Sequence, residues 1–350
     1  MNNSIEINGR RIGPDWPVYI VAELSANHHQ NYDQAVQLIH AAKEAGADAI
    51  KLQTYTADTL TIHSHLPYFR VSGGTLWDNC TLYELYTEAY TPWEWQPRLK
   101  AIANELGMDL FSTPFDTTAI DFLEEIGVPA YKIASFELVD LPLIRRIART
   151  GKPIIMSTGM ATLAEIDEAV QTIHQVGNNQ IALLKCTSAY PALPEEMNLR
   201  TLPHLAEAFQ VPVGLSDHTL GIAAPTAAVA LGACFIEKHF TLSRDIPGPD
   251  SAFSLEPAEF KAMVQAVQTA EKALGRVSYQ VTEHEAASRI FRRSLFVVQD
   301  VKAGEAFNEA NVRSIRPAYG LHPRYLPEII GRRAAQDIEC GTPLEWKLIS

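Results

Sequence analysis

The chain has 350 residues, of which 47% are hydrophobic and 20% are charged. This composition is typical of a folded soluble protein with enough apolar surface for a large core, and it excludes a peptide-sized module and a disordered chain. The formal net charge is −12 and no block of lysines and arginines occurs, which argues against nucleic acid as a partner. An anionic ligand would need a few basic side chains aimed into one pocket.

The cysteines and the apolar stretches bear on the compartment. Four cysteines, at positions 80, 186, 234 and 340, are far apart in the sequence, so we expect buried reduced thiols and a reducing cytoplasm. Residues 1–14 have no apolar signal-peptide core. The longest apolar stretch, 222–236, is too short and too interrupted to span a bilayer, so we expect no membrane partner.

Short runs rich in β-branched residues alternate with amphipathic segments from residue 18 to residue 275. Between the runs, as at 32–47 and 162–177, apolar residues recur at helical spacing and a glycine follows. Repeated strand–helix units predict an α/β fold, a parallel (β/α)₈ TIM barrel with its active site at the C-terminal ends of the strands. An open doubly wound sheet is the alternative, but no glycine-rich dinucleotide motif follows the first strand. The predicted strands are 18–25, 48–55, 109–115, 130–135, 153–159, 181–188, 212–218 and 234–241.

One connection breaks this alternation. Residues 56–92 are rich in aromatic side chains and far longer than an ordinary loop, on the face where barrels carry their chemistry. A lid, a subunit contact and a surface excursion without function are all open. A helix at 256–275 would complete a catalytic barrel at 1–280, and a polar linker is expected at 281–292.

Residues 293–350 predict a small β-rich domain of short alternating strands. The pattern of 300–307 recurs at 337–344, and both segments are strand–turn–strand signals. A domain of this size is marginal alone and would gain stability by packing on another unit.

Two histidines are expected to meet at the mouth of the barrel. Because strand side chains alternate, His239 and Glu237 face the same side of the eighth strand. His218 likewise shares a side of the seventh strand with Ser216. Neutral imidazoles on neighbouring strands suit a divalent metal with open positions for water and substrate, and the alternative is a structural role for each histidine.

Lysines inside strands indicate an anion site. Lys51 shares a side of the second strand with Gln53, and Lys132 lies within the fourth strand. A buried ammonium is costly unless it meets an anion, so the alternative is an internal ion pair with Glu23 or Glu237. Hydroxyl groups at the tops of other strands suit phosphate and carboxylate oxygens: Thr113, Ser135, Ser157 and Ser216.

Three carboxylates complete the candidate site. Glu23 lies on the first strand, Glu137 just past the fourth and Asp250 after the eighth. Each could act as a general acid or base, cap a helix or bind a lysine. The residues alone therefore predict a metal-assisted enzyme that acts on an anionic small molecule.

A series of motifs, in order along nearly the whole chain, resembles the sialic acid synthase family. The segment from residue 292 is similar to the antifreeze-like (SAF, β-clip) domain of that family. Within the family the sequence is most similar to the branch that makes pseudaminic acid, on the cues AELSANH, GGTLWD, LYELY, YGLHP, and Lys185 and Ser188 in KCTSAYP. The motifs are AELSANHH, GADAIKLQTY, FSTPFD, YKIASFEL, STGMAT, KCTSAYP, GLSDHT, IEKHFT and GPDSAFSL.

The resemblance implies a transferase that condenses phosphoenolpyruvate with an open-chain amino sugar and water and releases phosphate by carbon–oxygen cleavage. In this branch the sugar would be 2,4-diacetamido-2,4,6-trideoxy-L-altrose. Synthesis of N-acetylneuraminic or legionaminic acid is the nearest alternative. A metal-dependent pyruvate aldolase and a carbohydrate- or ice-binding protein are the more remote ones.

The resemblance also implies roles for individual residues. His218 and His239 would hold Mn²⁺, Mg²⁺ or Co²⁺, which polarises the sugar aldehyde. Glu137 would position or deprotonate the attacking water, whereas Glu23 and Asp250 would bind sugar hydroxyls and transfer a proton, although these three roles could be exchanged. The groups expected to bind phosphoenolpyruvate are Lys51, Thr113, Lys132, Ser135, Ser157, Ser188 and Ser216.

The sugar site is expected to draw on two subunits. Gln53 and Tyr190 would lie near the sugar in one barrel. Arg316 would reach that barrel from the SAF domain of the other subunit, which implies a domain-swapped homodimer. Without the resemblance, Arg316 would be interpreted as part of a surface ion pair of little energetic value.

Overall fold

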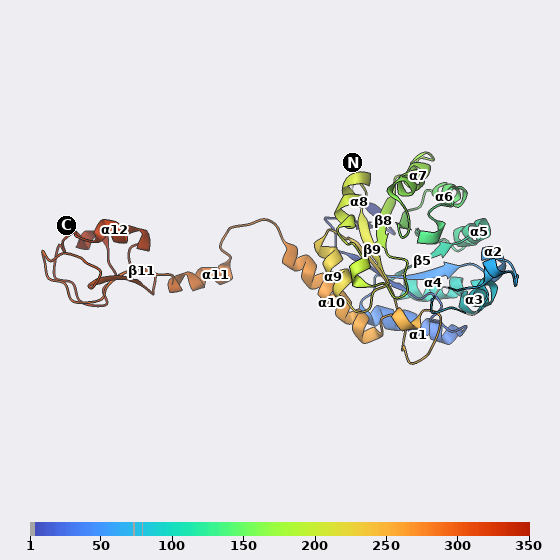
Figure 1. Cartoon of the computed structure of the whole chain (residues 1–350), viewed down its shortest axis with the longest axis horizontal. Coiled ribbons are helices and arrows are strands. Elements are labelled where there is room, and N and C mark those ends of the chain that lie inside the picture. The colour runs from blue at the N-terminus through green and yellow to red at the C-terminus, as the bar shows by residue number, and fades with distance from the viewer. Residues whose placement is uncertain (1–3, 73, 79) are drawn as a thin grey trace. The chain divides into compact units, whose positions relative to one another are not determined.

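The computed structural model describes residues 4–72, 74–78 and 80–350. The chain forms two compact units, Met1–Gly275 and Arg276–Ser350 (Figure 1). Within the described residues, no helix combines the length and the apolar character needed to cross a membrane.

The first unit contains a closed barrel of parallel strands, which confirms the predicted fold. The strands are neighbours in chain order, and β10 closes the ring between β9 and β3. Each strand lies within its predicted range. The strands are β3 Tyr19–Glu23, β4 Ala49–Thr54, β5 Asp109–Pro114, β6 Tyr131–Ile133, β7 Ile154–Ser157, β8 Ile181–Cys186, β9 Val213–Asp217 and β10 Phe235–His239.

Helices surround the strands of this unit (Figure 1). Local signals set their ends: the Asn31 side chain accepts from Gln34 N at the start of α1, and Gly46 ends that helix with a φ of 96°. Thr162 and Glu165 form a capping box at the start of α7. The helices are α1 Tyr32–Ala45, α4 Gln96–Glu105, α5 Thr117–Glu125, α6 Leu141–Ala148, α7 Leu163–His174, α8 Thr201–Phe209, α9 Ala223–Ala230 and α10 Pro257–Leu274.

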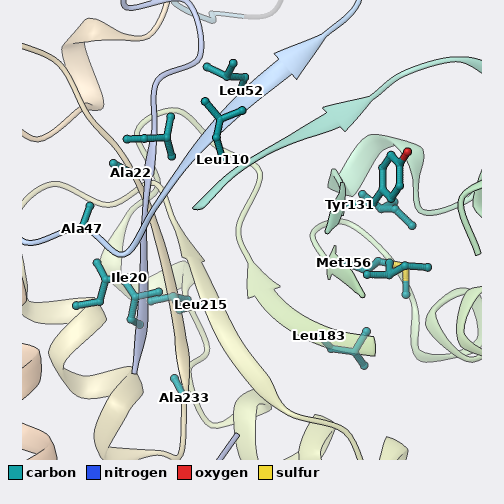
Figure 2. Close-up of a cluster of buried hydrophobic side chains, with 14 of the residues drawn as sticks. Ile20, Ala22, Ala47, Leu52, Leu110, Tyr131, Met156, Leu183, Leu215 and Ala233 are labelled. Atoms are coloured by element: carbon teal, nitrogen blue, oxygen red, sulfur yellow. The ribbon is translucent and has the colours of Figure 1, made fainter. Parts of the chain in front are cut away.

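The alternation of strand side chains creates two separate apolar cores. Outward-facing residues pack between the strands and the helices, and Figure 2 shows Leu52, Leu110 and Leu215 among them. Inward-facing Tyr19 and Phe235 pack in a second cluster. Gly214 permits this inner packing, because a Cβ there would lie only 2.4 Å from the Phe235 carbonyl oxygen.

An N-terminal hairpin, which the sequence analysis did not predict, completes the inner core. It pairs β1 Ile5–Ile7 with β2 Arg10–Ile12, and its isoleucines join the inward-facing cluster. The N-terminal part of the barrel interior is therefore apolar. The polar inward side chains are left to the C-terminal ends of the strands.

The segment 56–92 is a folded excursion between β4 and α4. It contains α2 Ala57–Leu60, a 3₁₀ turn at Pro67–Phe69 and α3 Leu82–Ala89. A second 3₁₀ turn, Trp93–Trp95, leads into α4.

The second unit has a short helix inside the segment expected to be a linker. α11 spans Glu283–Ser288 because Thr282 and Glu285 form a capping box ahead of good helix formers. The antiparallel strands β11 Ser294–Val297 and β12 Val312–Ile315 follow, and then α12 Leu326–Ile329.

The two similar segments of the second unit pair with each other. Val301 and Ile338 form an antiparallel bridge in which each backbone N–H donates to the other carbonyl. Asp337 Oδ1 accepts from Ala303 N and Asp300 Oδ1 accepts from Cys340 N, each at 2.8 Å. The internal repeat therefore places equivalent aspartates on equivalent backbone groups.

The cysteines differ in burial. All four are free thiols, and Cys186 and Cys234 are buried as expected. Cys80 is only half-buried and Cys340 is exposed, so the prediction of buried thiols was wrong for these two. Cys340 is exposed because its segment forms a surface turn of the small second unit.

Candidate active site

Two lysines and two glutamates form a buried cluster inside the barrel. Lys51 Nζ lies 2.7 Å from Glu23 Oε2 and 3.4 Å from Glu237 Oε1. Lys132 Nζ lies 2.9 Å from Glu237 Oε1, and Ser216 Oγ donates to the same oxygen at 3.1 Å. The predicted alternation is confirmed, and both lysines form the internal ion pairs that were the alternative to an anion site.

Burial shifts the protonation of this cluster. Burial opposes ionisation of Glu237, but Lys132 and Lys51 outweigh it and lower its pKa to about 2. Burial raises the pKa of Glu23 in spite of Lys51. Burial also lowers the pKa of Lys132 in spite of Glu237. Glu237 is therefore firmly ionised, whereas burial disfavours the charged forms of both Glu23 and Lys132.

Small polar groups converge beside the lysines. Gly159 N donates to Ser135 Oγ at 3.1 Å, and a Cβ at Gly159 would lie 2.3 Å from Ser188 Oγ. Thr113 Oγ1 and Ser157 Oγ are buried without a hydrogen-bond partner. Hydroxyl donors at the ends of parallel strands, next to buried ammonium groups, can bind the oxygens of a phosphate or a carboxylate.

The rings of the two predicted metal ligands lie next to each other, edge to face. The ring centroids of His218 and His239 are 5.4 Å apart. His218 Nδ1 lies 2.9 Å from the Thr187 carbonyl oxygen, so it donates there and Nε2 is left for another partner. His239 Nδ1 is buried without a hydrogen-bond partner and lies 3.9 Å from Asp250 Oδ2.

The protonation of this pair suits a cation. Burial and the nearby His218 lower the pKa of His239 well below its ordinary value, so the ring is the neutral, metal-binding form. Burial opposes protonation of His218, but Cys186, with its sulfur 3.9 Å from Nδ1, raises the pKa, and a bound cation would displace that proton. In the part of the chain that the structure describes, no three His, Cys, Asp or Glu side chains form a metal cluster. The pair thus fits a cation that takes its other ligands from water and substrate.

The three predicted carboxylates occupy different environments. Glu137 ends a 3₁₀ turn after β6, and its Oε2 is buried without a partner. Burial raises the pKa of Glu137 to about 7, a value suited to proton transfer near neutral pH. Glu23 Oε1 accepts from Gln53 Nε2 at 3.0 Å. Burial raises the pKa of Asp250 against the opposing hydrogen bond of Ser25.

Aromatic rings line one side of the histidine pair. The ring of Tyr190 lies 4.4 Å from His218 and 5.2 Å from Phe253. Phe253 in turn lies 4.8 Å from His239. Burial raises the pKa of Tyr190, so its hydroxyl remains a neutral hydrogen-bond donor.

Arg316 belongs to the second unit, whereas all the other predicted site residues belong to the barrel unit. Its side chain is exposed, and it forms no hydrogen bond or ion pair with any described residue. The contact of Arg316 with a barrel stays a prediction. Among the described side chains, Arg316 has no partner for the surface ion pair that was the alternative.

Sequence reasoning gave too little weight to two inward-facing residues. Glu237 accepts from both Lys132 and Ser216, although the sequence analysis considered it only as a partner of the lysines. Cys186 faces inward beside His218, and burial of its thiol is outweighed by His218, which lowers the pKa to about 6. The sequence contained the signal for both residues. Glu237 lies on the same side of its strand as His239, and Cys186 lies on the same side as Ser188.

A cavity of about 620 Å³ lies at the opposite end of the barrel. Ile5 and Glu6 of the N-terminal hairpin line it, together with Phe209 at the end of α8. It is remote from the lysines and histidines, so its size does not make it the candidate active site.

Known proteins share this architecture. Residues 38–279 match the NeuB family and residues 292–350 match the SAF domain. The chain belongs to the NeuB family. This finding confirms the resemblance that the motifs indicated.

Two named enzymes are similar to this NeuB-family chain over nearly its full length. Pseudaminic acid synthase from Campylobacter jejuni is 49% identical, over 95% of this chain and 96% of its own. Pseudaminic acid synthase from Helicobacter pylori is 47% identical, over 94% and 96%. The structure of spore coat polysaccharide biosynthesis protein SpsE from Bacillus subtilis covers 99% of both chains, with 37% identity and a TM-score of 0.68.

Proposed function

We propose that this NeuB-family protein is a pseudaminic acid synthase. It condenses phosphoenolpyruvate with 2,4-diacetamido-2,4,6-trideoxy-L-altrose and water, and it releases pseudaminic acid and phosphate. The observation that carries the proposal is the 49% identity to an enzyme of that name, over 95% of this chain.

The lysine cluster supports the binding of phosphoenolpyruvate. Lys51 and Lys132 both approach one oxygen of Glu237, and the hydroxyl groups of Ser135 and Ser188 lie together beside Gly159. In a buried site these groups would bind the phosphate and the carboxylate and keep bulk water away from the enol carbon.

The histidine pair would hold the divalent metal, Mn²⁺, Mg²⁺ or Co²⁺. When bound, such a cation supplies a Lewis acid for the aldehyde oxygen of the sugar. The Thr187 carbonyl oxygen would orient the ring of His218, and Asp250 Oδ2 lies 3.9 Å from His239 Nδ1. Imidazole and oxygen ligands suit all three of these metals.

The carboxylates would handle the protons. With a pKa of about 7, Glu137 can accept a proton from the water that adds to the former enol carbon. Glu23 is buried beside Gln53, and Asp250 is buried beside His239. These two carboxylates would bind sugar hydroxyls and protonate the new alkoxide. Elimination of phosphate by carbon–oxygen cleavage completes the reaction.

A second copy of the chain would complete the sugar site. Large apolar side chains are exposed after four consecutive strands of the barrel mouth: Phe136 (58%), Met160 (63%), Leu193 (51%) and Leu220 (62%). An apolar rim of this kind fits a protein interface. We propose a homodimer in which the partner's SAF domain covers this rim and brings its own arginine, equivalent to Arg316, to the sugar.

The test is phosphate release from phosphoenolpyruvate with Mn²⁺ and each of three sugars. Release with 2,4-diacetamido-2,4,6-trideoxy-L-altrose alone is expected. Release only with N-acetylmannosamine or with the precursor of legionaminic acid would keep the reaction type and replace the substrate. No release with any of the three would favour a pyruvate aldolase.

A further inference from the structure

The insertion between β4 and α4 carries one aromatic side chain, Trp77, on a short closed turn. The backbones of Arg70 and Thr81 form an antiparallel β-bridge, and Val71 N donates to Cys80 O at 2.9 Å. The two ends of the turn are therefore paired. Inside the turn, Trp77 N donates to Thr75 Oγ1 at 3.3 Å. The backbone at Trp77 is therefore held by hydrogen bonds within its own segment.

The side chain of Trp77 joins two loops of the barrel mouth. Its Nε1 donates to the Pro249 carbonyl oxygen at 2.8 Å, directly before Asp250. Its ring lies 5.4 Å from the ring of Tyr190. One residue thus contacts both the loop after β8 and the loop after β10, and these loops carry two of the predicted sugar contacts.

Trp77 also extends the row of rings beside the histidines. Trp77 contacts Tyr190, Tyr190 contacts Phe253, and Phe253 contacts His239. The result is an aromatic wall, made of Trp77, Tyr190 and Phe253, that runs from the insertion to the metal pair. Polar groups bind the hydroxyls of a sugar, whereas an aromatic wall binds its apolar parts. A trideoxy sugar with two acetamido groups offers three methyl groups for such a wall.

We infer that Trp77 is a positioning residue for the sugar substrate. It holds the ring of Tyr190 and the backbone before Asp250 so that the aromatic wall meets the methyl groups of the sugar. This inference rests on the proposed function. It gives the insertion a role in sugar selection, and it leaves the binding of phosphoenolpyruvate to the lysine cluster.

The test compares Trp77→Ala and Trp77→Phe with Tyr68→Ala, a control on the same insertion at a side chain that is 88% exposed. Trp77→Ala should raise the KM for the sugar about tenfold, or about 1.4 kcal/mol, and leave the KM for phosphoenolpyruvate within about twofold. Trp77→Phe keeps a ring beside Tyr190 and loses the hydrogen bond to Pro249, so its sugar KM should rise about threefold. Tyr68→Ala should change neither KM.

Two results would contradict the inference: a wild-type sugar KM in Trp77→Ala, or equal increases of both KM values. Thermal melting of each variant shows whether it is folded, and Trp77→Phe carries the test if Trp77→Ala is not. Wild-type enzyme that releases no phosphate with the altrose derivative would overturn the proposed function and this inference together. Active wild-type enzyme with an unaffected Trp77→Ala variant would overturn this inference alone.

Discussion

Among the described residues of the barrel unit, buried lysine–carboxylate systems lie both inside the ring of strands and outside it. Outside, Lys238 Nζ lies 2.5 Å from Asp217 Oδ2, and both side chains are fully buried. Thr219 closes this pair, because its N–H and hydroxyl donate to Asp217 and its carbonyl accepts from Lys238. Both charged groups of this pair therefore have hydrogen-bond partners.

The inner system is organised differently. Lys51 and Lys132 both approach a single oxygen of Glu237, whose other oxygen is buried without a hydrogen-bond partner. Thr113 Oγ1 and Ser157 Oγ nearby also have none. A fully satisfied pair fits a structural role, whereas a cluster with unpaired buried groups fits a ligand-binding role. The two systems are alike in burial and charge. They differ in whether every buried polar group has a hydrogen-bond partner.

The largest effect is expected for the histidine pair beside the inner cluster. His218→Ala or His239→Ala should reduce turnover at least about a thousandfold, because the proposed Lewis acid is lost. Folding should be preserved, and circular dichroism checks it. Mn²⁺ binding, followed by electron paramagnetic resonance, should also fall. Full activity in either variant would contradict the metal assignment.

The next largest effect is expected at Glu137. Glu137→Gln should lower kcat by about 10² to 10³-fold, which is the range for loss of a general base. Because burial raises the pKa of Glu137 to about 7, the wild-type rate should rise with pH through that value as the carboxylate ionises. A pH–rate profile of Glu137→Gln should lack this limb. An unchanged limb would assign it to another group.

Matched lysine variants compare the two systems directly. Lys51→Met should lower kcat/KM for phosphoenolpyruvate about a hundredfold, because it removes one of the two cations that would meet the anion. Lys238→Met should leave kcat/KM of the folded protein unchanged. It should lower the free energy of unfolding by about 3–5 kcal/mol, because it leaves the buried carboxylate of Asp217 without its ion-pair partner. Denaturant unfolding and steady-state kinetics on both variants check this. The reverse pattern would exchange the two roles.

The smallest effect is expected for Arg316. Arg316→Ala should raise the KM for the sugar about tenfold and that for phosphoenolpyruvate less, because the arginine is proposed to meet the sugar only. Mixed dimers of Arg316→Ala and His239→Ala chains should recover part of the activity. Mixed dimers without any recovery would refute a site shared between subunits.

Alternation along the strands made most of the barrel predictable. The sequence placed Lys51 with Gln53 and His239 with Glu237 on common sides, and the ion pairs and the ring contacts agree. The outer pair, Lys238 with Asp217, was missed. Its side chains follow the same alternation but point to the outer side of the strands. Which lysine binds a ligand depends on hydrogen bonds across several strands, and a single strand pattern does not contain them.

Other features depended on contacts between distant segments. The hairpin of β1 and β2 is stabilised by packing of Ile5, Ile7 and Ile12 against the inward-facing residues, and short local patterns do not predict such packing. The contact of Trp77 with Pro249 joins residues 172 positions apart. The sequence indicated that 56–92 is unusual, and only the fold shows what it touches.

The central claim is that the lysine cluster inside the barrel binds phosphoenolpyruvate. Its reaction with the altrose derivative then breaks the carbon–oxygen bond of phosphoenolpyruvate. The most direct measurement uses phosphoenolpyruvate with ¹⁸O in the oxygen that bridges carbon and phosphorus, and mass spectrometry of the phosphate released by the wild-type enzyme. The account predicts that the phosphate carries the ¹⁸O and that its release requires 2,4-diacetamido-2,4,6-trideoxy-L-altrose. Phosphate without the label, or labelled phosphate released without that sugar, would contradict it.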